Sequence, residues 1–221
     1  MVRTLIIGVF LCLAAAAGAA GGRQMPAVAD VLAAYNAGID LTTSEIESLT
    51  VRQVVIEPCD DGEDRTATAV LSYVRGSELE RTVLASDLRY PAGEYRLRSL
   101  VGPFISEDDY RVTVAGRERM EGEECIRLDV EALERDVDHF DGTVWVSAID
   151  GGPVRIRGAV ADPPFPAREI LLDKSFALVN GRYRLVRRHT GEVEVGLILG
   201  SRRGVRHIFY EEYTVSAVKR N

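Results

Sequence analysis

The chain has 221 residues, of which 46% are hydrophobic and 28% are charged, and its formal net charge is −7 at pH 7. A chain of this length can bury the core of one sizeable domain. The acidic balance argues against a nucleic-acid partner, because phosphate binding requires a clustered basic surface. The basic pairs Arg187-Arg188 and Arg202-Arg203 instead stand apart, among acidic residues.

The beginning of the chain has the pattern of a secretory signal peptide. An early arginine supplies the positive start, an apolar segment follows, and small residues lead to a cleavage site near Ala19 or Ala20. The apolar segment is shorter than the roughly 20 residues of a membrane-spanning helix. We therefore expect residues 1–20 to be removed during export and residues 21–221 to form a single domain.

Removal of this segment leaves two cysteines, Cys59 and Cys125. In an exported chain an even pair favours one disulfide, so these two residues are the candidate bridge. A bridge requires their Cα atoms to lie about 4.4–6.8 Å apart, which the sequence leaves open. Neither cysteine belongs to a C-x-x-C motif, so a redox role is not expected.

The next segment, residues 26–38, is predicted to be the main helix. Pro26 suits the first turn and Gly38 suits the end. A second, shorter helical turn is predicted within residues 42–49, with Thr43 or Ser44 as its cap. The apolar side chains of the main helix fall at positions i, i+3, i+4 and i+7 and form one face that must pack against another layer: Val28, Val31, Leu32 and Tyr35.

From Val51 onward the chain is a series of short β-rich segments, separated by Gly, Asp, Asn and Pro. The clearest hairpin turns are Asp150-Gly151-Gly152 and Asn180-Gly181, whose residues tolerate positive φ. In the first hairpin Val144 and Val146 are expected on one face and Trp145 on the other. The predicted strands are 51–57, 66–74, 79–86, 95–101, 109–119, 123–130, the two arms of the hairpin within 139–160, and then 168–179, 182–189, 192–199 and 204–218.

The element pattern predicts a mainly β (α+β) fold. The even spacing of the strands and the scarcity of helical periods favour an antiparallel meander of about ten or eleven strands in one domain. A sheet of that width must curl or split to remain compact. We therefore predict a strongly curved antiparallel sheet that forms an incomplete β-barrel, with the N-terminal helix covering its concave face.

The reactive side chains do not form a recognisable catalytic or metal-binding motif. His139, His189 and His207 lack the spacing that places two metal ligands on one helix face, and the G-x-S-x-G motif of a nucleophile elbow is absent. The sequence therefore predicts that the protein is not an enzyme, and it calls for no metal or other cofactor.

Apolar residues accumulate on the predicted strands and on the helix. Most of them suit an ordinary packed core, but a curved sheet with an underfilled concave face would leave an apolar cavity for a ligand. Further candidates for the inward face are Val112, Val114, Ile170, Leu172 and Leu199. The residues predicted to line such a cavity are Val31, Leu32, Tyr35, Leu71, Tyr73, Trp145, Phe176, Leu197, Phe209 and Tyr213.

Four segments together resemble the outer-membrane lipoprotein-sorting proteins of the LolA-like superfamily. They cover, with the leader and the first helix, most of the mature chain. Tyr183 stands where that family usually has Trp, and Leu185 where it has Pro. The segments are "LVGPFISEDDYRVTVAGRERMEGEECIRLDV", "FDGTVWVSAIDGGPVRIRG" with Trp145, "FALVNGRYRL" and "HIFYEEYTV".

The resemblance implies a periplasmic, monomeric half-barrel whose apolar concave face accepts a lipid or the acyl chains of lipoproteins during outer-membrane lipoprotein sorting. Inner- or outer-membrane envelope proteins would be its partners for loading and release. The alternative is an envelope sensory or protein-interaction module that uses the same half-barrel without transporting lipid. A bound lipid would favour the carrier, whereas a stable protein partner and a well-filled concave face would favour the module.

Overall fold

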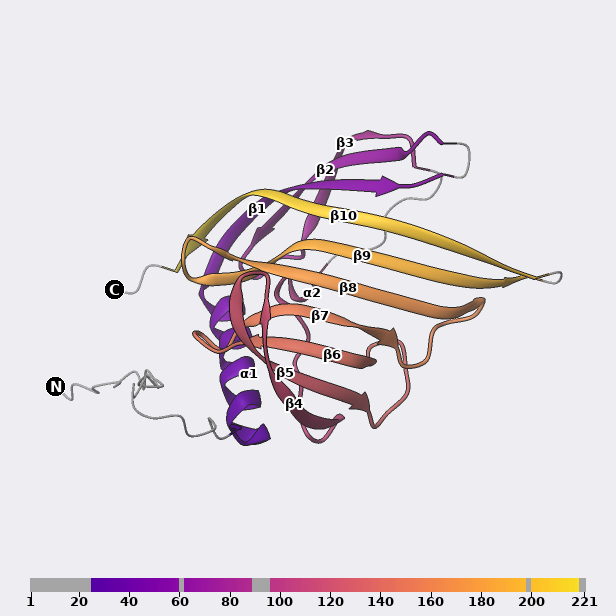
Figure 1. Ribbon diagram of the computed structural model, residues 1–221. Helices are drawn as coiled ribbons and strands as arrows, with labels where there is room; N and C mark the ends of the chain where they lie inside the picture. The colour runs from indigo at the N-terminus through magenta and orange to yellow at the C-terminus, as the bar shows by residue number, and fades with distance from the viewer. Residues whose placement is uncertain (1–24, 60–61, 89–95, 198–199, 219–221) are drawn as a thin grey trace.

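The computed structural model describes residues 25–59, 62–88, 96–197 and 200–218 (Figure 1). The predicted signal peptide and its cleavage site near Ala19 or Ala20 lie outside the described residues. Ten strands form one sheet in the order β3-β2-β1-β10-β9-β8-β7-β6-β5-β4, and all neighbouring pairs are antiparallel. The strands are β1 (Ile46–Glu57), β2 (Arg65–Val74), β3 (Glu80–Ser86), β4 (Tyr110–Met120), β5 (Glu123–Ala132), β6 (Phe140–Ser147), β7 (Pro153–Val160), β8 (Ala167–Val179), β9 (Tyr183–Leu197) and β10 (Gly200–Ala217).

The sheet is a meander that changes direction once. Strands β4 to β10 follow one another, and β1 then pairs with β10, so the first and last strands of the chain are neighbours. The strands β3 and β4 form the two edges and do not pair with each other, so the curved sheet stays open. The predicted incomplete barrel is confirmed.

The main helix, α1 (Val28–Glu45), is longer than predicted. Gly38 does not end it, since the chain stays helical to Glu45; in this last part the hydroxyl of Thr42 donates to the Gly38 carbonyl at 2.9 Å and that of Thr43 to the Ile39 carbonyl at 3.0 Å. The predicted second helical turn is therefore wrong: its first residues complete α1, and β1 begins directly at Ile46. Within the described part of the chain, neither helix is long and apolar enough to cross a membrane.

Two further element predictions are corrected. Residues 95–101, predicted as a strand, contain the short helix α2 (Leu97–Val101), whose Leu100 and Val101 are buried in the core. The segments 182–189 and 192–199, predicted as two strands, belong to the single strand β9, because Thr190 and Gly191 stay paired with β8 and β10 and do not turn the chain.

The two helices lie against one face of the sheet, which we call the inner face; α1 contacts β4 and β9, and β1 leads away from its C-terminal end (Figure 1). Polar contacts join the two helical segments. The hydroxyl of Tyr35 donates to the Pro103 carbonyl at 2.9 Å, and the amide of Asn36 exchanges hydrogen bonds with the backbone of Ile105. The hydrophobic core lies between these helices and the inner face.

The predicted turns are confirmed. Gly151 has φ 73°, and Asn180 and Gly181 have φ 53° and 64°, so these residues adopt the left-handed conformation that tight hairpins require. Beyond the helices, β8, β9 and β10 continue as long strands and project from the body of the sheet (Figure 1). The inner face therefore has one part that the helices cover and one part that extends past them.

Candidate ligand-binding face

The side chains of the inner face can be assigned from the strand register, because residues directly opposite each other lie on the same face and side chains alternate along a strand. Val55 on β1 is fully buried in the core and pairs with Ile208 on β10, which pairs with His189 on β9. The residues at every second position of β9 from His189 to Val195 therefore face inward, as do their partners on β8 and β10.

The covered part of the inner face is filled by side chains. Five of the residues predicted to line a cavity are buried here in the packed core, with at most 5% of their surface exposed: Val31, Leu32, Tyr35, Leu71 and Phe176. Tyr73 and Tyr213 are half-buried against the same core, and the Tyr213 hydroxyl donates to the Val186 carbonyl at 2.6 Å. These seven residues pack the protein interior.

Trp145 and Phe209 do not line the concave face, because the register places both on the outer face. Trp145 is paired with Arg127 and Arg155, its Nε1 donates to Glu118, and the guanidinium of Arg155 lies 6.0 Å from its ring centre. Phe209 lies opposite Val54 and Arg188. Both aromatic residues lie on the strands predicted for them, but the face of Phe209 depends on a register that only the structure supplies. The side chains of Leu197 and Leu199 lie outside the described residues.

The candidate disulfide between Cys59 and Cys125 is not formed. Both thiols are free, and each Sγ lies 3.6 Å from a carbonyl oxygen of its own segment, Cys59 from Glu57 and Cys125 from Glu123. The strands β1 and β5 are separated in the sheet by β10, β9, β8, β7 and β6, which explains why the two cysteines do not meet. Burial raises the pKa of the Cys125 thiol to about 11, so this cysteine is a poor nucleophile.

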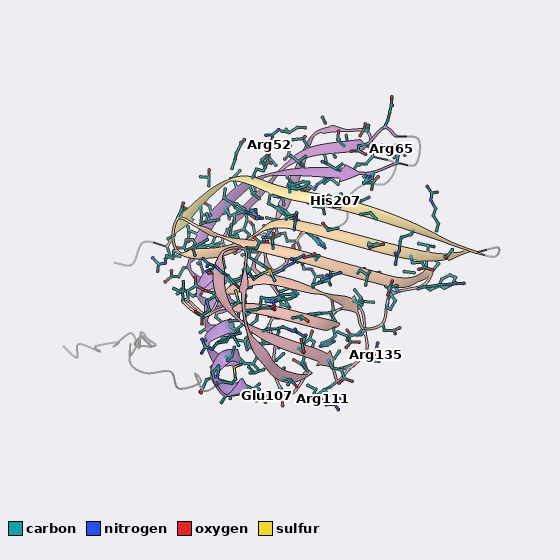
Figure 2. All side chains as sticks on the ribbon, in the orientation of Figure 1. Arg52, Arg65, Glu107, Arg111, Arg135 and His207 are labelled. Atoms are coloured by element: carbon teal, nitrogen blue, oxygen red, sulfur yellow. The ribbon has the colours of Figure 1, made fainter. Side chains whose placement is uncertain are left out.

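The three histidines do not converge. His139 on the loop before β6 has its Nδ1 2.7 Å from the carboxylate of Asp136. His207 (labelled in Figure 2) lies on the outer face, where its Nδ1 is 3.1 Å from the hydroxyl of Thr190, whereas His189 faces inward. Among the described residues, no three His, Cys, Asp or Glu side chains gather as metal ligands.

The part of the inner face beyond the helices carries an apolar strip. Ile170 and Leu172 on β8 lie beside Val193 and Gly191 on β9, and Val195 continues the same face. All four apolar side chains are half-buried, and only Leu172 packs against the core. We call Ile170, Leu172, Val193 and Val195 the distal strip. Ile170 and Leu172 were predicted to face inward, whereas Val193 and Val195 were not, although the alternation in "EVEV" is a sequence signal that indicates them.

Two basic residues lie where the distal strip meets the covered core. Lys174 on β8 is directly opposite His189 on β9, and both are half-buried on the inner face. Their row continues with Ile156 on one side and Ile208 on the other, which are core residues. Burial lowers the pKa of Lys174, and burial together with the charge of Lys174 lowers the pKa of His189 to about 3.

Other charged groups near the strip are paired. Arg206, which follows the basic pair along the inner face of β10, donates to the carboxylate of Glu57. On the outer face, Arg203 forms ion pairs with Glu169 and Glu192. A separate hollow of about 320 Å³ lies at the end of α1, and its lining includes Glu45 and Arg182, which form an ion pair. Ala217 and Val218 also line that hollow, so its wall is half charged and less suited to an acyl chain than the distal strip.

Comparison with known proteins identifies similar solved structures only. No family model matches the chain, and no curated protein matches it. A LolA superfamily protein from Nitrosomonas europaea matches 88% of this chain and 96% of its own, at 12% identity and a TM-score of 0.45. A DUF1329 family protein from Desulfovibrio piger matches 86% of this chain and 94% of its own, at 10% identity and a TM-score of 0.45.

A complex of MucA and MucB from Pseudomonas aeruginosa also matches, over 85% of this chain and 94% of that chain, at 12% identity and a TM-score of 0.32. The first of these structures belongs to the superfamily that the quoted sequence segments resemble. With all three TM-scores below 0.5, the similarities carry no argument about a ligand or a partner. The proposals below rest on the residues of this chain.

Proposed function

We propose that the protein is an exported, periplasmic binding protein that holds an acyl chain of a lipid or lipoprotein against the distal strip and so acts as a carrier. The observation that carries this proposal is the distal strip itself. It consists of apolar, inward-facing side chains on adjacent strands, half-buried and beyond the cover of both helices.

The size of the strip suits an acyl chain. From Gly191 to Val195 the strand rises about 13 Å at about 3.3 Å per residue, and each methylene group that leaves water there contributes about 0.8 kcal/mol. Binding of this kind needs no catalytic group, and release needs only a partner that offers the chain a better site. A part-covered strip therefore provides affinity without enclosing the ligand completely.

The test compares two valines on opposite faces of neighbouring strands. Val193 faces inward in the distal strip, whereas Val205 on β10 pairs with Glu192 and faces outward, and both are half-buried. We expect the wild-type protein and V205D to bind a fluorescent fatty acid, and V193D to lose binding by tenfold or more, about 1.4 kcal/mol. Thermal melting followed by circular dichroism checks that both variants fold.

Native mass spectrometry of the protein isolated from its own periplasm supplies the second measurement. An acylated species that copurifies with the wild-type protein and with V205D, but not with V193D, supports the carrier. Equal binding by V193D and V205D, or a wild-type protein that refuses every acyl ligand, would overturn it.

A second candidate function, the protein-interaction module, is favoured by the edge strand β3. Val83 and Leu84 are 48% and 62% exposed on this strand, and the outer edge of β3 is not paired within the sheet. An exposed apolar edge is a template for an added strand from another protein. Replacement of Thr82 by proline should abolish a stable envelope partner found by crosslinking and leave fatty-acid binding unchanged; lost fatty-acid binding would count against this role.

A further inference from the structure

We infer that Lys174 and His189 form a site for an anionic oxygen group, a carboxylate or a phosphate, carried at the head of the acyl ligand. This inference rests on the proposed function and deepens it, because it assigns a head group to the ligand whose chain lies on the distal strip.

The position follows from the register. In an antiparallel pair, residues directly opposite each other have Cβ atoms about 4.5–5.5 Å apart, so Lys174 and His189 present their polar ends to the same small volume. Their neighbours on the adjoining strands, Ile156 and Ile208, are at most 7% exposed. Two polar side chains thus interrupt an otherwise apolar row, where a random pair of basic residues would be unfavourable.

Within the part of the chain that the structure describes, no carboxylate forms an ion pair with Lys174 or His189. Lys174 and His189 form no hydrogen bond or ion pair with another described residue, and the two charges that act on His189 are those of Lys174 and Asp173. Asp173 lies on the opposite face, where both of its oxygens accept hydrogen bonds from Arg155. The nearby Arg206, in contrast, has its own carboxylate in Glu57. Among the described residues, the pair therefore has no carboxylate to accept hydrogen bonds from it.

Burial makes the lack of an opposite charge beside Lys174 unfavourable. The pKa of Lys174 is lowered by burial alone, which shows that its surroundings disfavour the ammonium. A buried ammonium is stable only beside an opposite charge, and a neutral imidazole adds one N–H donor. An anionic oxygen group placed between them would accept a charge-assisted hydrogen bond from Lys174 and a second hydrogen bond from His189.

Space for such a group is present at Gly191, two residues along β9 on the same face. A methyl group placed on Gly191 would lie 3.8 Å from His189 Nε2 and within 4 Å of no other described atom beyond its chain neighbours. Gly191 lies opposite Leu172, the first residue of the distal strip. Glycine in the interior of a strand often marks a place where a ligand approaches the backbone closely.

The direction of the ligand follows. Along β9 the order on the inner face is His189, Gly191, Val193 and Val195, so the basic pair stands at the covered end and the apolar residues run outward. A ligand bound with its head at Lys174 and His189 would lay its chain along Val193 and Val195. The anionic head then lies beside the basic pair, and the apolar chain lies on the distal strip.

The experiment uses four probes and calorimetry on the full mature chain. The probes are laurate, dodecyl phosphate, neutral 1-monolaurin and inorganic phosphate, each below its aggregation concentration. The variants are K174M and H189F, with R157M as the control, because Arg157 is an exposed basic residue on the outer face opposite Asp173. Melting temperatures establish that each variant is folded.

We expect the wild-type protein to bind the two anionic amphiphiles at least about tenfold more tightly than monolaurin, as one charge-assisted hydrogen bond provides. K174M and H189F should lose this preference and keep the affinity for monolaurin, and R157M should behave as the wild type.

Equal affinity of the wild-type protein for charged and neutral amphiphiles, or a preference that survives in K174M, would overturn the head-group site and leave the proposed function intact. Failure of all three amphiphiles would overturn the proposed function. Binding of inorganic phosphate that depends on Lys174, without any amphiphile binding, would overturn the acyl-borne ligand and reveal a free-anion site instead.

Discussion

Arg184 on β9 and the facing pair of Lys174 on β8 and His189 on β9 are basic groups with opposite surroundings. At one end of β9, Arg184 reaches both oxygens of Glu123 at 2.7 and 2.8 Å and Oδ2 of Asp150 at 2.9 Å. Burial opposes the charge of Arg184, but these hydrogen bonds outweigh it and raise its pKa. Five residues further along β9, His189 lies opposite Lys174 on β8, and neither has such a partner among the described residues.

The difference separates a structural cluster from a candidate binding site. The carboxylates of Glu123 and Asp150 tie β5 and the β6–β7 turn to β9, so the charge of Arg184 is fully used inside the protein. Lys174 has no ion-pair partner among the described residues, and a charged group without a partner in the protein is available for a ligand. Three stability measurements, with one exposed reference, sharpen this contrast.

The largest effect is expected for Arg184. R184M leaves two partly buried carboxylates without their partner and should lower the free energy of unfolding by about 3 kcal/mol in urea at pH 7. The hydrogen bond from Arg184 lowers the pKa of Glu123, so this contribution is present above the usual Glu range and is lost as the pH falls through the lowered pKa. The difference in the free energy of unfolding between wild type and R184M should therefore become smaller in acid. A destabilisation by R184M of less than about 1 kcal/mol at pH 7 would contradict the structural role of Arg184.

His189 should give a pH effect of intermediate size. Its folded pKa of about 3 keeps the imidazole neutral in the native protein, whereas the unfolded chain takes up a proton below about pH 6.5. The unfolded state then binds more protons, so the free energy of unfolding falls as the pH drops from 6.5 toward 3. Between pH 7 and 5 the loss is about 2 kcal/mol.

The variants H189Q and H207Q isolate that contribution. H189Q removes the inward-facing imidazole and should flatten the decline between pH 7 and 5, whereas H207Q, on the outer face, should retain it. Urea unfolding at four pH values measures both. A decline of equal steepness in H189Q and H207Q would show that the inner-face imidazole is not the cause.

Substitution of Lys174 should change the free energy of unfolding in the opposite direction to substitution of Arg184. K174M removes an ammonium that burial disfavours and should raise the free energy of unfolding by about 1 kcal/mol at pH 7 in the ligand-free protein. The gain shrinks as the pH rises toward about 10.4, because the folded lysine of the wild type loses its proton before the unfolded one does. Destabilisation by K174M would place Lys174 with the structural residues and break the comparison.

The smallest effect is expected for an exposed pair at the sheet edge. Arg111 Nη1 lies 2.6 Å from Glu131 Oε2, both side chains are more than half exposed, and Arg111 lies at the rim formed by β4 (Figure 2). E131Q should change the free energy of unfolding by about 0.5 kcal/mol or less, because solvent screens such pairs. A larger loss of unfolding free energy would mean that burial does not distinguish the stabilising ion pairs of this protein from the others.

Four glycines show which local features could be predicted from the sequence. Gly151 and Gly181 were assigned to hairpin turns and adopt positive φ there, because a tight turn is a local property of a few residues. Gly38 and Gly191 were assigned to an element end and to a break between strands, and both assignments are wrong. The helix continues past Gly38 to Glu45, and pairing with strands on both sides keeps Gly191 extended.

The candidate site depended on the same distinction. Ile170 and Leu172 were predicted to face inward, since alternation along one strand is visible in the sequence. Lys174 was not among the predicted site residues, and His189 was placed at a strand end and rejected as a metal ligand. Nothing in the order of residues places Lys174 beside His189, which lies 15 positions further along the chain and meets it only through the β8–β9 register.

The sequence by itself determined the mainly β class, the N-terminal amphipathic helix and the sharp turns, because these depend on side-chain periodicity and on the local conformational freedom of glycine and asparagine. The tertiary structure alone decided which face of each strand is covered, that Cys59 and Cys125 stay apart, and that two basic residues share a row without a carboxylate. Those properties arise from pairing between distant segments: a shift of one residue in register moves every side chain of a strand to the other face.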